Sequence, residues 1–474
     1  MDKSTKKLLS GSMIYFLGNA MTQLLSLALL RFVTGRISPE EYGIYNLIVT
    51  VANLVTPVLT LQIADAVFKF ILASKTEDEK RKYYTVGLCV TIASVFITIV
   101  LVYLVEYLFS DIPYCLLVAL YIAFTGAYNI YQRIARSVGR NKDFVAGNLI
   151  KTMVFLSLEI FLIYAFGLGA QAIFIAVIVS YVVFLIFVES RIHSLRYLDI
   201  GSIDLSTVKE MLSFSIPLIP NTIFWWLTSS INTIIVSVRC GLDINGIYTV
   251  ANKFSSVLVM VTSVFAMSWQ ESALSEYGSK DFRSFFTKTF DMYSVGIASA
   301  LSVLITLMHL IFPLIIDESY YQSIMYAPYL LLASGCSALA GFSAQIFLAK
   351  SENKRLLLTN ILGMVLNILI VLLLIDQVGL WAAVFGTLIA EISISGSRLI
   401  WVRGEFSDKY KASRLILSSF TLMISIILYF CGDIRVNAVW LLITLTAFIC
   451  FNRMLIGNIV SILIEAVKGR KLRE

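Results

Sequence analysis

The side chains of this 474-residue chain that could do chemistry are ionisable and polar groups inside long apolar segments. Lys253 follows Asn252 about two turns into one such segment, and Lys151 and Glu159 share a face of another. A lysine near the centre of a membrane-spanning helix costs roughly 2.5–3.5 kcal/mol on insertion scales. Lys253 is therefore a candidate anion-binding residue, with snorkelling of its amine to the outer interface as the alternative. Glu159 is a candidate carrier of a coupling proton, with a structural hydrogen bond as the alternative.

Polar residues recur at steps of three, four and seven in several apolar segments, so each set lies on one helical face. Such a stripe faces another helix or water, because contact with lipid is costly for polar groups. One interpretation is interhelical packing through hydroxyls and amides. The interpretation we adopt is a water-filled central cavity whose candidate substrate-binding residues are Lys253, Asn252, Asn19, Gln23, Asn53, Asn221, Trp225 and Lys151.

The cysteines and histidines do not form a catalytic or metal-binding pattern. Six cysteines are scattered without a Cys-x-x-Cys pair, and His193 and His309 are the two histidines. Cysteines inside apolar runs usually act as small hydrophobic residues. We therefore expect no metal site, no catalytic residues and no cofactor, in a protein that is not an enzyme.

The segments that hold the candidate residues have the composition and length of membrane-spanning helices. Hydrophobic residues make up 58% of the chain and charged residues 14%, whereas soluble domains carry about 25% charged residues. Apolar runs of spanning length lie at about 9–31, 42–70, 84–109, 113–134, 144–166, 169–188, 211–238, 246–270, 288–316, 322–349, 356–375, 379–400, 412–431 and 436–465. The sequence predicts an all-α polytopic membrane protein with about fourteen transmembrane helices.

The distribution of Lys and Arg predicts the orientation of these helices. With a cytoplasmic N-terminus, 29 of the 37 Lys and Arg residues fall in cytoplasmic segments. Outer loops then hold only four, which are Arg31, Arg36, Arg239 and Arg435. By the positive-inside rule both termini are cytoplasmic. The net charge of +7 therefore reflects topology and gives no reason to expect nucleic-acid binding.

The chain also contains an internal repeat. An Arg stands seven residues before Gly-Ile-Tyr at Arg36 and again at Arg239. Arg81-Lys-Tyr-Tyr-Thr85 returns as Arg283-Ser-Phe-Phe-Thr287, and Gly169-Ala-Gln-Ala172 returns as Gly379-Leu-Trp-Ala382. We predict two parallel six-helix repeats that form two lobes, at 1–190 and 210–402. A cytoplasmic connector at 191–209 joins them, and two further helices with a basic cytoplasmic tail follow at 403–474.

Several stretches carry a resemblance to a known family: Leu8-Leu-Ser-Gly-Ser12, Ser38-Pro-Glu-Glu-Tyr-Gly-Ile-Tyr45, Arg136-Ser-Val-Gly-Arg-Asn-Lys142 and Gly379-Leu-Trp-Ala-Ala-Val-Phe-Gly-Thr387. With them the whole chain resembles the polysaccharide transporter family of the multidrug/oligosaccharidyl-lipid/polysaccharide exporter superfamily. The resemblance implies an O-antigen-type flippase that moves an undecaprenyl-diphosphate-linked oligosaccharide across the bacterial cytoplasmic (inner) membrane by alternating access. It also implies a cationic central cavity and coupling to a proton or sodium gradient. Few cations lie at mid-membrane in this sequence, so Lys253 and Lys151 are expected to serve that cavity.

The partners implied are a lipid-linked O-antigen, capsule or exopolysaccharide repeat unit, membrane lipids and polysaccharide polymerase machinery. One alternative is an ion-coupled drug/cation antiporter of the same superfamily, a class that favours buried acidic residues. Another is a membrane polysaccharide polymerase or ligase. Such an enzyme needs a sizeable outer loop with catalytic charges, whereas no loop between the apolar runs exceeds about twenty residues.

Overall fold

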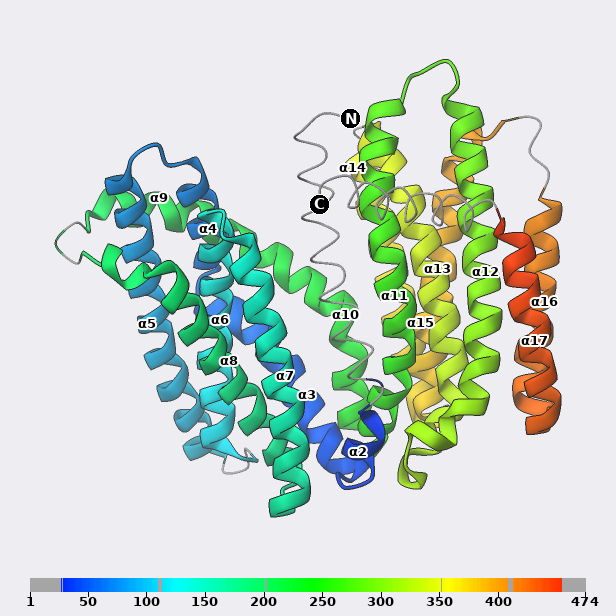
Figure 1. Cartoon of the computed structure of the whole chain (residues 1–474), viewed down its shortest axis with the longest axis horizontal. Coiled ribbons are helices and arrows are strands. Elements are labelled where there is room, and N and C mark those ends of the chain that lie inside the picture. The colour runs from blue at the N-terminus through cyan, green and yellow to red at the C-terminus, as the bar shows by residue number, and fades with distance from the viewer. Residues whose placement is uncertain are drawn as a thin grey trace, which may run out of the picture. The chain divides into compact units, whose positions relative to one another are not determined.

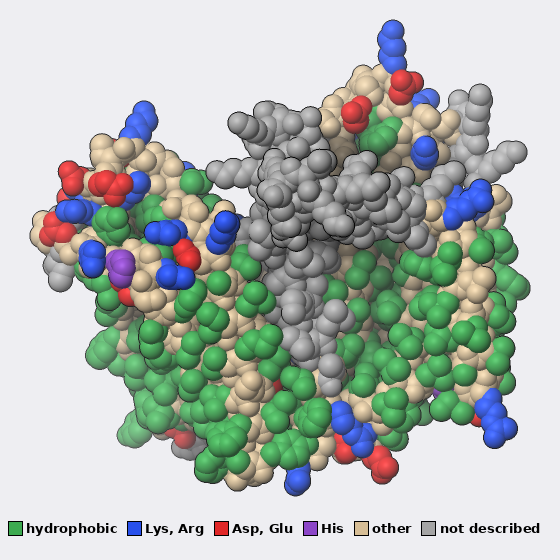
Figure 2. Space-filling view, in the orientation of Figure 1, with side chains coloured by type: hydrophobic (Ala, Val, Ile, Leu, Met, Phe, Trp, Pro, Cys, Tyr) green, Lys and Arg blue, Asp and Glu red, His purple; other side chains and the backbone are tan. Residues whose placement is uncertain are grey.

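The computed structural model describes residues 27, 29–109, 113–199, 201, 203–350, 352–407 and 412–453, and within these ranges every regular element is a helix (Figure 1). Twelve of the described helices are long and apolar enough to cross a membrane. Figure 2 shows apolar side chains along their length and charged side chains toward their ends. Hydrocarbon offers no hydrogen-bond partners, so such surfaces suit contact with lipid. The chain is thus the multi-pass, all-α membrane protein that its composition predicted.

The predicted total of fourteen spans is not confirmed. The first apolar run, 9–31, lies mostly outside the described residues, including its polar candidates Asn19 and Gln23. The seventh run, 211–238, is divided between two helices, and neither is among the twelve candidate spans.

Packing contacts divide the chain into two compact units, Met1–Thr249 and Val250–Glu474. The boundary falls inside one long helix, α11 (Leu242–Glu276). The other described helices of the first unit are α2 (Leu30–Thr34), α3 (Pro39–Leu59), α4 (Ile63–Ala73), α5 (Glu77–Phe109), α6 (Cys115–Ser137), α7 (Asn141–Phe166), α8 (Ala170–Ile192), α9 (Leu205–Ser215) and α10 (Ile219–Arg239).

Local sequence explains where α3 begins. The Ser38 hydroxyl accepts a hydrogen bond from the Glu41 N–H at 3.2 Å, and the Glu41 carboxylate accepts one from the Ser38 N–H at 3.4 Å. Pro39 occupies the first turn, where no N–H is needed. This reciprocal cap starts the helix directly after the predicted outer loop.

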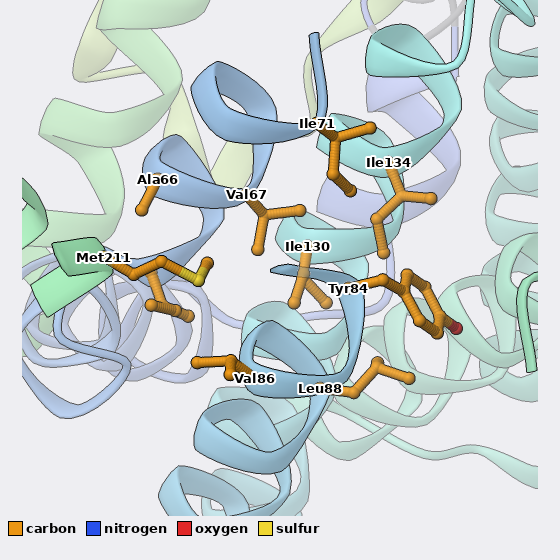
Figure 3. Close-up of a cluster of buried hydrophobic side chains, with 10 residues drawn as sticks. Ala66, Val67, Ile71, Tyr84, Val86, Leu88, Ile130, Ile134 and Met211 are labelled. Carbon is orange, nitrogen blue, oxygen red and sulfur yellow. The ribbon is translucent and has the colours of Figure 1, made fainter. Parts of the chain in front are cut away.

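A hydrophobic core of the first unit joins four helices (Figure 3). Ile63 and Val67 of α4 are fully buried against Ile130 of α6 and Val86 of α5. Met211 of α9, which is also fully buried, closes this cluster. Because α9 contributes to the core, it packs as part of the first unit although it overlaps the predicted connector and the start of the predicted second lobe.

The sequence alone also does not separate helix α9 from the run that follows it. It begins at Leu205, within the region predicted as connector, and a short 3-10 turn at Ile216–Leu218 separates it from α10. The Asp204 carboxylate accepts hydrogen bonds from the Ser206 hydroxyl at 2.7 Å and the Thr207 N–H at 2.6 Å. These bonds and the ammonium of Lys82, 3.2 Å away, hold the pKa of Asp204 well below its usual range.

The predicted second span, 42–70, is broken in the structure. α3 ends at Leu59 and α4 begins at Ile63. Pro57 lies inside α3 and lacks the N–H that would continue the hydrogen-bond ladder. Leu61 and Gln62 have positive φ angles of 51° and 53°. Left-handed backbone costs non-glycine residues about 1–3 kcal/mol each, so surrounding contacts hold this break in place.

The second unit continues α11 and contains α12 (Phe282–Ile315), α13 (Ser323–Ala349), α14 (Asn353–Val378), α15 (Leu380–Trp401), α16 (Ser413–Cys431) and α17 (Ile434–Phe451). Stacked rings fill its interior: Trp269 of α11 lies 4.3 Å from Phe342 of α13 between ring centroids. The Trp269 indole N–H donates to the Phe342 carbonyl oxygen at 2.9 Å. This bond satisfies the polar end of an otherwise apolar side chain.

The Gly-Ile-Tyr motifs of the two repeats meet where α3 crosses the start of α11. A Cβ on Gly43 would lie 1.7 Å from the Leu242 carbonyl oxygen, and a Cβ on Gly246 would lie 1.9 Å from the Pro39 carbonyl oxygen. Pro39 and Leu242 are related by the same offset as the two glycines, so the crossing is symmetric. The Asn245 amide donates to the Gly43 carbonyl oxygen at 3.0 Å and fixes the register. Only glycine permits backbones to approach this closely.

Candidate substrate site

Lys253 lies on α11, half-buried, within the second unit. Its neighbour Phe254 is 6% exposed and stacks on Phe312 of α12 with ring centroids 5.5 Å apart. Successive side chains point about 100° apart on a helix, so Lys253 projects away from this core contact. Asn252 beside it is also half-buried. The pair therefore lies at the margin of the unit's own core.

Lys151 lies on α7 in the first unit and is held by aromatic side chains. Its amine donates to the Tyr128 hydroxyl at 3.2 Å and lies 4.6 Å from the centroid of that ring. It also lies 5.5 Å from the centroid of Tyr181. The Tyr128 hydroxyl in turn donates to the Asn148 side-chain oxygen at 2.6 Å. Cation–π contacts of this kind stabilise a desolvated ammonium, so Lys151 has a structural partner and keeps donors for a ligand.

Glu159 lies two turns further along α7 and is 5% exposed. A carboxylate this deeply buried must be protonated or hydrogen-bonded and paired. Both the proton-carrier and the structural interpretation require that burial, so the role of Glu159 stays a prediction.

The amide residues predicted for the cavity occupy helices that pack together within the first unit. Asn53 on α3 and Asn221 on α10 are both exposed. The Trp226 indole N–H on α10 donates to the Thr50 carbonyl oxygen of α3 at 2.7 Å. The side chain of Trp225 lies outside the described part of the chain, as do Asn19 and Gln23. The roles of these residues therefore remain predictions.

A polar cavity of about 270 Å³ opens at the break between α3 and α4. Its polar side chains come from α4, the turn before it, α5 and the end of α6, and they include Gln62, Asp65, Thr91, Asn129, Gln132, Arg133 and Arg136. The Arg133 guanidinium pairs with the Asp65 carboxylate at 2.6 Å. The Gln62 side-chain amide also donates to Asp65, at 2.8 Å. Charged and amide groups thus converge on a helix break, which is where membrane transporters often place ligand sites.

Sequence reasoning missed this cavity because its partners are distant in the chain. Asp65 would be expected to pair with Lys69 one turn later, but it pairs with Arg133 instead. The Lys69 amine lies 3.8 Å from the centroid of Phe214. Arg133 was assigned to a cytoplasmic segment by the topology count. The one local indication in the sequence is Pro57, which predicts a helix kink but does not indicate which residues lie opposite that kink.

Arg398 is a second intramembrane cation that the sequence did not reveal. It lies on α15 and is 5% exposed. Its guanidinium donates to the Thr359 hydroxyl at 3.0 Å, the Ala340 carbonyl oxygen at 2.9 Å and the Asn360 side-chain oxygen at 2.7 Å. These bonds tie α13, α14 and α15 together, so Arg398 holds the second unit's helices rather than marking a cytoplasmic loop.

Comparison with known proteins identifies a family model and solved structures that are similar to this chain. The model of a family described as "Polysaccharide biosynthesis protein" matches residues 8–269. A solved structure of the lipid II flippase MurJ in an inward closed conformation superposes with a TM-score of 0.70 at 14% identity, covering 95% of this chain and 100% of that one. An inward-facing multidrug resistance MATE family transporter of the MOP superfamily gives a TM-score of 0.63 at 15% identity, covering 85% and 99%. No curated protein matches the chain.

At such low identities the structural likenesses establish the fold, while the family match spans more than half of the sequence. The chain belongs to the polysaccharide biosynthesis protein family, and it has the fold of the multidrug/oligosaccharidyl-lipid/polysaccharide exporter superfamily.

Proposed function

We propose that this protein is a flippase. Its cargo would be an undecaprenyl-diphosphate-linked oligosaccharide, a repeat unit of O-antigen, capsule or exopolysaccharide, moved across the bacterial cytoplasmic membrane by alternating access. The observation that carries this proposal is membership of the polysaccharide biosynthesis family. The likeness in fold to a lipid II flippase supports it.

The physical task is to move a diphosphate and several sugars through about 30 Å of hydrocarbon. Unpaired charge there is prohibitive, so the head group needs polar and cationic contacts while the lipid tail stays in the bilayer. We assign the diphosphate to Lys253, with Lys151 as a second cation. Sugar hydroxyls would bond to Asn252, Asn19, Gln23, Asn53 and Asn221, and one ring would stack on Trp225. The lobes at 1–190 and 210–402 would rock to release the cargo.

A drug/cation antiporter of the same fold is the second candidate, since MATE transporters share the architecture. The half-buried lysines Lys151 and Lys253 disfavour it, because a cationic drug would be repelled by them. A polymerase or ligase is a third candidate. The charged catalytic residues of such an enzyme would have to lie in short loops, so this candidate has the least support.

The decisive experiment measures translocation of a fluorescent undecaprenyl-diphosphate oligosaccharide in proteoliposomes. The parent protein should expose the label to an outside quencher, while a cationic dye should not be transported. Transport of the dye without the lipid-linked sugar would establish the antiporter instead. Lys253→Ala should slow translocation by about tenfold or more, since truncating a charge that contacts a desolvated partner costs about 2–5 kcal/mol.

Lys288→Ala is the matched control, because Lys288 is an exposed lysine of α12 in the same unit. It should leave the rate unchanged, and Lys253→Arg should retain most of it. If Lys253→Ala flips at the parental rate with normal folding, the assignment of the diphosphate to Lys253 is wrong.

A further inference from the structure

The cavity at the break between α3 and α4 has a wall that is built before any ligand arrives. Gln62 has a left-handed backbone, and its side chain is fixed at both ends. Its amide nitrogen donates to Asp65 at 2.8 Å, and its amide oxygen lies 3.4 Å from the Thr222 hydroxyl of α10. Asp65 is fixed in turn by Arg133. Strained backbone that is held in this way is a feature of binding sites.

The charged side chains on this wall are Asp65, Arg133 and Arg136, and their arrangement bears on which ligand class fits. The Arg133–Asp65 pair is neutral as a unit, and Asp65 would repel a phosphate that approached Arg133. Arg136 lies 5.3 Å from the centroid of Phe68, and its side chain is exposed. A phosphate in the cavity would therefore lie beside the Asp65 carboxylate, and a cation would lie beside two arginines.

The same wall offers alternating donors and acceptors to a neutral polyol. Asn129 is exposed, and its side chain makes no hydrogen bond within the described part of the chain. Thr60 and Thr91 donate to their own helix carbonyls, at 2.8 and 2.9 Å, so their oxygens remain free to accept. Amides, hydroxyls and a carboxylate–guanidinium pair match sugar hydroxyls, each of which donates and accepts.

The cavity also has the volume that a single sugar ring requires, and it lies toward the side of the membrane from which the ligand would be loaded. At about 270 Å³, it lies just below the roughly 300–1,000 Å³ of drug-sized pockets, so it suits a single ring rather than a chain. It lies toward the end of the broken span that the positive-inside rule places at the cytoplasmic side. Cargo of the proposed flippase is loaded from that side.

We propose that this cavity binds one monosaccharide residue of the cargo and selects the glycan at loading. The inference rests on the proposed flippase function for its cargo. The binding step itself is local to the first unit, so it is measured without any translocation.

The test is protection of a cysteine in the cavity. Thr60 lines the cavity and is half-buried. In a background without the six native cysteines, Thr60→Cys in lipid nanodiscs is labelled with a water-soluble maleimide, with and without glucose, galactose or N-acetylglucosamine. A sugar at about ten times its Kd should slow labelling about tenfold by mass action. Ser190→Cys, at the exposed end of α8, is the control and should label at one rate throughout.

Asn129→Ala in the Thr60→Cys protein should weaken protection several-fold, because it removes a donor and an acceptor without disturbing a hydrogen bond of the described residues. Asn141→Ala, at an exposed position on α7, should not. Protection by pyrophosphate but by none of the sugars would make the cavity an anion site and overturn the proposal. The absence of protection by any sugar up to solubility would also overturn it, whereas loss of flipping with intact sugar protection would count only against the flippase.

Discussion

At the scale of single residues, buried charge is the feature that most separates structure from expectation. Arg398 donates three hydrogen bonds to groups on two neighbouring helices and is almost fully buried. We expect Arg398→Met to destabilise the protein by roughly 1–3 kcal/mol, because the acceptors it leaves behind stay buried without donors. Thermal unfolding in detergent measures this loss. Arg403→Met, at an exposed position just beyond α15, should change the midpoint little.

Arg398→Lys should recover only part of the loss, since an ammonium lacks the planar fork that reaches three acceptors. An unchanged midpoint for Arg398→Met would show that water replaces the guanidinium and that the helices do not depend on it.

These residues also show what a sequence read alone can establish. The apolar runs follow from composition, and the described part of the chain contains twelve helices long and apolar enough to be spans. Arg133 and Arg398 lie near the predicted cytoplasmic ends of apolar runs, where position along the chain cannot distinguish a loop cation from a buried one. Asp65 and Arg133 are far apart in sequence, so their pairing depends on how α4 packs on α6. Leu61 and Gln62 carry no sign of left-handed backbone, because tertiary contacts impose it.

At the scale of elements, the glycine crossing of α3 and α11 makes a prediction with an internal control. Gly43→Ala and Gly246→Ala should each destabilise by about 1–3 kcal/mol, because the new methyl group meets a carbonyl oxygen that cannot move alone. Gly341→Ala on α13 and Gly396→Ala on α15 meet nothing within 4 Å. They should stabilise by about 0.5–1 kcal/mol through helix propensity.

Thermal unfolding of the four variants checks the signs. Similar losses for Gly43→Ala and Gly246→Ala are expected from the symmetry of the crossing. A loss of stability for only one of the two variants would mean that the two glycines do not contribute equally to this contact.

At the scale of the whole molecule, the proposed transport requires a source of free energy, and Glu159 is the predicted carrier of a coupling proton. Glu159 is buried on a membrane-spanning helix, where its proton can be exchanged only when a conformational change admits water. Glu159→Gln keeps the shape and fixes the neutral form, so it should leave downhill flipping intact and abolish the acceleration by a transmembrane pH gradient. Initial rates in proteoliposomes, with and without the gradient, measure this. Glu276→Gln, at an exposed position near the end of α11, should keep the full response. If Glu159→Gln also keeps it while Glu391→Gln on α15 loses it, the proton is carried in the second unit and the assignment of Glu159 is wrong.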